Sequence, residues 1–186
     1  DCVDVAEELE QTQVVCVADR EADIFELFNY QQEHPQVELL IRAAHERSSK
    51  RRGYTSLFEQ LRTSKLKTSF PLQVPAHSAR SGKSNQKPAK GSDARTAIME
   101  LRYETIKLPP PDSTLHRKKE PIRLSMIHLV EVDCPDKVTP IEWFLITTLP
   151  VNSDANALKY IQWYRSRWRI EEWHRVLKSG CGIEKL

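Results

Sequence analysis

Short apolar runs divide the first forty positions into alternating helices and strands. The spacing of apolar residues predicts a short helix over 3–10, and Val14–Ala18 is an unbroken, mostly β-branched run typical of a strand buried on both faces. Helical spacing resumes over 23–28, and a second buried strand is predicted over 37–41. This succession of strand, helix and strand indicates an α/β layer.

The middle of the chain has a different period. Residues 99–104 switch between apolar and charged side chains at every step, and residues 122–132 are strand-like throughout. A period of two is typical of antiparallel sheets. Two polar tracts interrupt the pattern, and we expect 47–53 to form a basic loop and 77–95 to form a mobile tip.

The last segment returns to the α/β pattern. It predicts a strand over 142–148, a helix start at 152–154 and one long or two abutting helices over 155–178, ended by Gly180. The predicted layout is therefore an α/β core, residues 1–45 and 141–186, interrupted by an antiparallel β-rich insertion subdomain over 46–140.

Composition agrees with a globular protein. The chain has 186 residues, of which 39% are hydrophobic, so it can build one sizeable core with an inserted subdomain. No apolar run approaches the roughly 20 residues that cross a bilayer, which favours a soluble intracellular protein with no membrane partner. The four cysteines lack the paired spacing of a zinc site. The chain does not begin with Met, and we expect it to be a fragment.

The net charge of +2 conceals two opposed blocks. Residues 1–41 contain 11 acidic residues and one basic residue, whereas residues 42–107 contain 15 basic and 5 acidic residues. Such blocks suit a protein that holds cations with carboxylates in one place and a polyanion in another. The plainer interpretation is a solvated, charged surface.

Asp19 directly follows the first predicted strand. Open α/β sheets bind their ligands at the carboxyl ends of strands, where a side chain leaves the core while its backbone stays fixed. An Asp in this position also commonly caps the next helix, so both interpretations stay open.

A second cluster lies on the last predicted helix. At about 100° per residue, Tyr164, Arg167, Glu171 and Lys178 share one stripe, while apolar residues gather on the opposite arc. An exposed helix with ion pairs at i,i+4, such as Arg167 to Glu171, would explain Arg167 but not Tyr164 or the distant Lys178. Two carboxylates from separate elements, surrounded by basic residues, indicate a divalent-metal site that acts on a phosphodiester.

Two other signals carry less weight. Residues 81–84 have the end of a phosphate-binding loop, but His77 stands where its first glycine belongs, so an NTPase is not indicated. Trp143 and the other three tryptophans fit core positions, although stacking on a nucleobase is the alternative in a basic protein.

The run Asp19-Arg20-Glu21-Ala22-Asp23, taken with the Tyr-Arg-Glu-Lys spacing on the last helix, resembles the DDE transposases of the bacterial insertion-sequence family known as IS-four. The resemblance implies a ribonuclease-H-like core with a β-rich insertion. It also implies cleavage of DNA at transposon ends with two Mg²⁺ ions, for which Mn²⁺ can substitute, and strand transfer into target DNA. A hairpin intermediate, a homodimer in the synaptic complex and a cytoplasmic, nucleoid-associated bacterial protein follow from the same resemblance.

The resemblance also assigns roles to single residues. Asp19 and Glu171 match the second and third acids of the catalytic and metal-binding triad. Arg42, Tyr164 and Arg167 match residues that grip phosphates near a flipped base. Trp143 matches the aromatic residue on which that base stacks, and Lys178 matches a further DNA contact.

The chain also departs from the family pattern. The first acid should lie on an earlier strand, and Asp1 and Asp4 stand in a helix-like context, so we expect this acid outside the chain and the isolated chain to be inactive. Two alternatives stay open: a non-catalytic DNA-binding remnant of a transposase, and a metal-dependent nuclease of the same fold.

Overall fold

The computed structural model describes residues 2–9, 11–47, 56–76, 93–111, 119–136 and 138–167. The helices in these ranges are α1 (Cys2–Glu8), the short 3-10 helix η1 (Arg20–Ala22), α2 (Phe25–Glu33), α3 (Leu57–Arg62) and α4 (Asp154–Ser166). The strands are β1 (Val14–Ala18), β2 (Val37–Arg42), β3 (Thr68–Val74), β4 (Arg95–Leu108), β5 (Ile122–Val132) and β6 (Glu142–Thr147). The protein is therefore of mixed α/β class.

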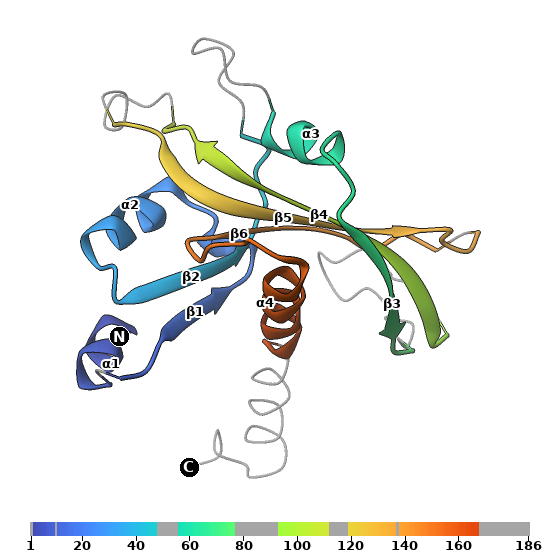
Figure 1. Cartoon of the computed structure of the whole chain (residues 1–186), viewed down its shortest axis with the longest axis horizontal. Coiled ribbons are helices and arrows are strands. Elements are labelled where there is room, and N and C mark those ends of the chain that lie inside the picture. The colour runs from blue at the N-terminus through green and yellow to red at the C-terminus, as the bar shows by residue number, and fades with distance from the viewer. Residues whose placement is uncertain are drawn as a thin grey trace, which may run out of the picture.

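These strands form a single curled sheet in the order β1-β2-β6-β5-β4-β3 (Figure 1). β1 and β2 are parallel, and every other neighbouring pair is antiparallel. β6 lies between β2 and β5, so it joins the parallel pair to the long antiparallel strands. The strands from the middle of the sequence thus extend the same sheet that β1 and β2 begin.

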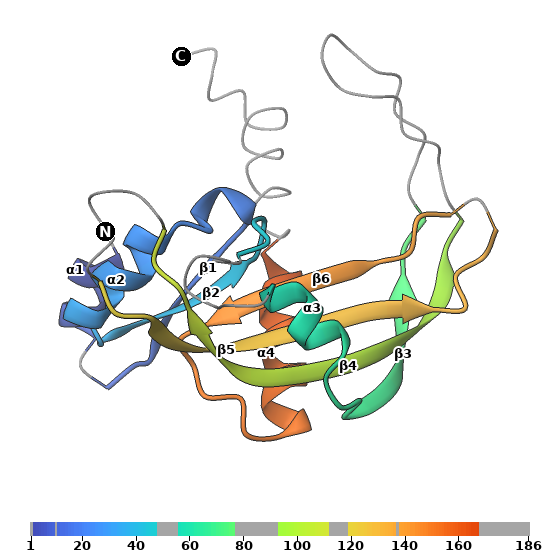
Figure 2. The same ribbon diagram turned by 90° about the horizontal axis from the view of Figure 1, so that it is seen from above.

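Helices cover both faces of this sheet. α3 and α4 lie on opposite sides of the strands, as Figure 2 shows from above. Side chains alternate between the faces along each strand: Ile41 packs in the cluster with α2 and α3, whereas Leu40 packs in the cluster with α4. The core therefore consists of two apolar layers with the sheet between them.

The apolar pattern predicted most strand positions. The strands predicted over 14–18, 37–41, 122–132 and 142–148 are present, the last ending at Thr147. The expectation that 14–18 is buried on both faces was wrong, because every residue of β1 is partly exposed. Among the described strands, β1 pairs with β2 alone and so lies at an edge of the sheet.

Local capping explains where helices begin. The hydroxyl of Ser153 accepts a hydrogen bond of 3.2 Å from the Asn156 amide and starts α4, as the sequence predicted. Ser56 caps α3 in the same way through Glu59, at 3.2 Å. The pattern did not predict α3 or β3 individually.

Several predictions fall outside the described residues. The predicted basic loop lies there except for Arg47, and so does most of the predicted tip over 77–95. The helix predicted over 155–178 is described to residue 167. The boundaries 1–45, 46–140 and 141–186 stay predictions. Within the described ranges, no helix is both long and apolar enough to cross a bilayer.

Candidate active site

Asp19 begins the 3-10 turn that follows β1. Its Oδ1 accepts a hydrogen bond of 2.8 Å from the Arg20 amide, so Asp19 is the N-cap of η1. The capping interpretation of this residue is therefore correct.

The same carboxylate also faces α4. The Tyr164 hydroxyl donates to Oδ1 at 3.3 Å, and Nη2 of Arg167 donates to Oδ2 at 3.0 Å. Strand alternation explains this direction, because Val17 packs in the cluster on the α4 side and Asp19 follows it by two residues. Asp19 therefore caps η1 through one oxygen and still presents its carboxylate to α4, with a side chain that is 39% exposed.

Arg42 comes from β2, the neighbour of β1, and Trp143 comes from β6, the next strand of the sheet. Arg42 ends β2 and pairs in register with Leu145 of β6, two residues from Trp143, so both side chains lie on the α4 face. The guanidinium carbon of Arg42 lies 5.9 Å from the centroid of the Trp143 ring. This spacing is that of a cation–π contact.

Tyr164 contacts both Trp143 and Arg167. Its ring meets the Trp143 ring edge-on, with 5.4 Å between centroids and an interplanar angle of 70°. The Arg167 guanidinium carbon lies 5.9 Å from the Tyr164 centroid. The structure therefore brings together five predicted site residues: Asp19, Arg42, Trp143, Tyr164 and Arg167. Trp143 is half-buried, so it packs against the core and still reaches the surface.

The electrostatics keep Asp19 ionised. Partial burial alone would raise the pKa of Asp19, but the Arg20 amide and the Arg167 charge outweigh burial. The pKa therefore lies below its ordinary value of 3.8, and the Arg42 charge adds to this effect. Burial raises the pKa of Tyr164; the charge of Arg42 opposes that rise and the charge of Asp19 reinforces it. Tyr164 thus stays a hydrogen-bond donor to an anionic carboxylate.

An ionised carboxylate with an exposed side chain is a ligand that hard divalent cations accept. No group of three His, Cys, Asp or Glu residues that could hold a metal occurs within the part of the chain that the structure describes. Glu171, the predicted third acid, and Lys178 both lie outside the described residues. Asp19 therefore supplies one suitable ligand, and the remaining protein ligands stay predictions.

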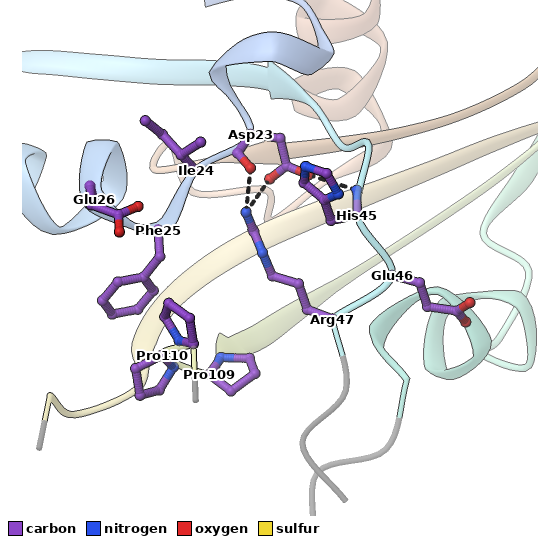
Figure 3. Close-up of a pocket in the computed structure, with 10 residues that line it drawn as sticks. Asp23, Ile24, Phe25, Glu26, His45, Glu46, Arg47, Pro109 and Pro110 are labelled. Atoms are coloured by element: carbon purple, nitrogen blue, oxygen red, sulfur yellow. Dashed lines mark hydrogen bonds and ion pairs between the residues drawn. The ribbon is translucent and has the colours of Figure 1, made fainter. Parts of the chain in front are cut away.

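Sequence reasoning missed the role of Asp23 and Arg47. Arg47 was expected in a basic loop, yet its side chain is only 14% exposed, and its Nη2 forms a 2.7 Å ion pair with the buried Asp23 carboxylate (Figure 3). The pair borders a pocket of about 240 Å³ that is also lined by Phe25, Glu26 and residues 109–111. The sequence signal that could have pointed to this pair is Asp23 itself, the second Asp of the run Asp19-Arg20-Glu21-Ala22-Asp23.

The sequence of the chain matches the family model of the transposase DDE domain over residues 3–186. The matched range contains all the strands described above and the five site residues that gather at the end of β1. Proteins with this domain are nucleic-acid-cleaving enzymes that take DNA as substrate and generally use divalent metals. The resemblance to DDE transposases that the sequence predicted is thereby confirmed at the level of the domain, and the chain belongs to the transposase DDE domain family.

Proposed function

We propose that this chain is the catalytic core of an IS-four-type transposase that cleaves DNA at transposon ends and joins them to target DNA through a hairpin intermediate. The observation that carries this proposal is the contact of Asp19 with both Tyr164 and Arg167, at 3.3 and 3.0 Å. Asp19 belongs to one of the two sequence motifs on which the resemblance rests, and Tyr164 and Arg167 belong to the other. The two motifs lie more than a hundred residues apart in the chain.

Asp19 acts as a metal ligand in this proposal, with Glu171 as its partner. Two Mg²⁺ ions, or Mn²⁺ in their place, would activate the attacking oxygen and stabilise the leaving oxygen of the phosphodiester. The lowered pKa of Asp19 supports the assignment, since it favours the charged carboxylate that a metal ligand needs.

Arg42, Tyr164 and Arg167 hold the phosphates of the cleaved strand. Guanidinium groups are two-pronged donors to phosphate oxygens, and the two arginines approach the same carboxylate from β2 and from α4. The strand would therefore lie across the ends of β1 and β2. Lys178 is a further contact in this proposal.

Trp143 stacks on an extruded base. A hairpin requires a sharp bend in the strand, and flipping a base costs a few kcal/mol, which stacking of about 1–3 kcal/mol offsets. The half-buried position of Trp143 suits this role, because the ring packs against the core. The guanidinium carbon of Arg42, whose N–H groups can donate hydrogen bonds to a phosphate, lies 5.9 Å from the ring centroid.

The first acid of the triad is proposed to come from a strand beside β1. The outer edge of β1 has no strand partner among the described residues, and Asp4 lies on α1 rather than at the end of a strand. A homodimer that binds two transposon ends is part of the same proposal, as is a cytoplasmic, nucleoid-associated location. The isolated chain is accordingly proposed to bind DNA without cleaving it.

A cleavage assay tests the proposal. The protein containing this chain and the upstream acid is incubated with Mg²⁺ and duplexes that carry transposon ends. Nicking, hairpin formation and strand transfer are scored for wild type and Asp19→Asn. We expect Asp19→Asn to abolish all three while DNA binding persists.

The same assay separates the alternatives. Cleavage without end specificity or strand transfer would indicate a simple nuclease, and binding without cleavage by the wild type would indicate a non-catalytic remnant. A parallel Mg²⁺ titration of the isolated chain, at two salt concentrations, should give salt-sensitive binding and no nicks. Nicks that disappear with Asp19→Ala would overturn the proposed inactivity of the isolated chain.

A further inference from the structure

Asp23 binds the segment that follows β2 at three points. Its Oδ2 accepts hydrogen bonds from the amides of Ala44 and His45, at 2.7 and 3.0 Å. Its Oδ1 lies 2.7 Å from Nη2 of Arg47 (Figure 3). The Asp23 side chain is completely buried. One carboxylate therefore bonds two backbone amides and one guanidinium within residues 44–47.

The backbone of Asp23 is tied to Asp19. The Asp23 amide donates to the Arg20 carbonyl at 3.2 Å, and the Ala22 amide donates to the Asp19 carbonyl at 3.0 Å. These bonds close the η1 turn, so Asp23 lies at a fixed position relative to the Asp19 carboxylate. The Asp23 carbonyl also accepts a 2.6 Å hydrogen bond from Arg47.

The segment that Asp23 holds is continuous with Arg42 and contacts β6. Ala44 follows Arg42 by two residues, and the Ala43 amide donates to the Phe144 carbonyl at 2.7 Å. Phe144 is the neighbour of Trp143. The bonds of Asp23 thus connect the turn that carries Asp19 to the strand ends that carry Arg42 and Trp143.

Stability alone does not require this arrangement. A buried ion pair contributes little or nothing to stability compared with apolar residues of similar volume. The amides of Ala44 and His45 both donate to one oxygen of this carboxylate, and such charge-assisted hydrogen bonds are directional. These contacts set where residues 44–47 lie relative to Asp23.

We propose that Asp23 is a positioning residue, whose buried carboxylate sets the spacing between Asp19 and Arg42 and thereby aligns the site with a DNA phosphate. This inference rests on the proposed function of Asp19, Arg42 and Trp143. It assigns Asp23 no contact with DNA and no part in the chemistry.

The test changes Asp23 and Arg47 together, because removal of the carboxylate alone leaves a buried, unpaired guanidinium and can unfold the chain. The double variant Asp23→Asn/Arg47→Met keeps an acceptor oxygen for the amides of Ala44 and His45. Its matched control, Asp23→Leu/Arg47→Met, fills the space but removes the acceptor. If the control does not fold in a thermal melt, Asp23→Ala/Arg47→Met takes its place.

The first measurement needs no DNA. The ¹⁵N–¹H signal of the Trp143 indole, assigned with Trp143→Phe, reports the position of the Arg42 guanidinium that lies 5.9 Å from the ring. We expect the Asn variant to keep the wild-type signal and the Leu variant to shift it, with both variants fully folded. Equal signals in the two variants would overturn the inference.

The second measurement compares two DNA probes, a duplex with one unpaired nucleotide near its end and the same duplex fully paired. If Trp143 stacks on an extruded base, wild type should prefer the first probe by about tenfold. The Asn variant should keep this preference within about twofold, and the Leu variant should lose most of it. A Leu variant that keeps the preference would refute the alignment role.

The two measurements distinguish the two proposals. If wild type shows no preference for the unpaired nucleotide, the base-binding role of Trp143 fails. The position of the indole signal would still decide whether Asp23 sets the geometry of Arg42.

Discussion

Arg167 at the end of α4 donates a 3.0 Å hydrogen bond to Asp19, which lies 148 residues earlier in the chain. The guanidinium forms an ion pair with this carboxylate, and its side chain is less exposed than that of Asp19, at 15% against 39%. The contact therefore balances the charge of a proposed metal ligand while leaving the carboxylate accessible from solvent.

Replacing Arg167 should raise the pKa of Asp19. In Arg167→Met the countercharge is lost, whereas in Tyr164→Phe only a hydrogen bond is lost, so the rise should be larger in the first variant. A ¹³C-detected titration of the Asp19 carboxyl group measures both. An unchanged titration in Arg167→Met would contradict the ion pair as a determinant of this pKa.

Glu171→Gln should abolish cleavage in the protein that carries the complete triad. Loss of a direct carboxylate ligand should cost at least about a hundredfold in rate, since loss of outer-shell partners already costs 10–100-fold. Rates of nicking on a labelled transposon end measure the effect. Glu172→Gln is the matched control, because only Glu171 shares the predicted stripe with Tyr164 and Arg167. Equal losses in the two variants would refute the assignment.

Trp143→Ala should slow hairpin formation more than initial nicking. Stacking of about 1–3 kcal/mol on an extruded base corresponds to a slowing of roughly 5- to 150-fold, while nicking does not require the flipped base. Time courses that resolve nicked and hairpin products test the difference. Trp143→Phe keeps an aromatic ring and should be affected less. Parallel loss of both steps together with a lower melting temperature would mean that Trp143 serves the core alone.

Protonation of the buried His128 should make the protein less stable in mild acid. Its ring stacks on Phe144 at 4.3 Å and bonds Glu142 through Nε2 at 2.9 Å, with Arg62 of α3 and Arg102 of β4 also nearby. Burial lowers the pKa of His128 below its ordinary value of 6.5, although Glu142 opposes the effect.

The unfolded chain therefore takes up the His128 proton at a higher pH than the folded protein does. The contribution of His128 is complete above pH 6.5 and is lost as the pH falls from there through the lower folded-state pKa, by up to about 1.4 kcal/mol per pH unit. Urea unfolding between pH 7.5 and 5 should show less pH dependence in His128→Phe. His45→Gln, at an exposed side chain, is the control and should follow wild type.

Local pattern predicted much of the secondary structure. The apolar run at 37–41 and the uninterrupted strand at 122–132 identified β2 and β5, because core positions leave a clear period in the sequence. The partial exposure of β1, which pairs with β2 alone among the described strands, was missed, since an apolar run does not reveal how many strands will pair with it. α3 has only six residues, too few for a helical period to stand out.

The candidate site was predictable to a different degree for different residues. Asp19 and the Tyr164–Arg167 pair followed from position and spacing. Arg42 came only from the family resemblance, which also singled out Trp143 among the four tryptophans. Their proximity depends on the register between β2 and β6, which pairs Arg42 with Leu145 and which no local pattern encodes. Asp23 was missed for the same reason: its partners lie about twenty residues away, beyond α2 and β2.

The position of β6 between β2 and β5 has a consequence for biosynthesis. Thr147 of β6 bonds the Leu39 carbonyl of β2, and the two residues are 108 positions apart. At a translation rate of about 5–20 residues per second, the ribosome needs on the order of 5–20 s to make the strand that completes this pairing. Throughout that interval, the buried run Leu39-Leu40-Ile41 has an open hydrogen-bonding edge. Until β6 is made, nascent β2 can therefore pair with a strand of another chain, which is a route to aggregation.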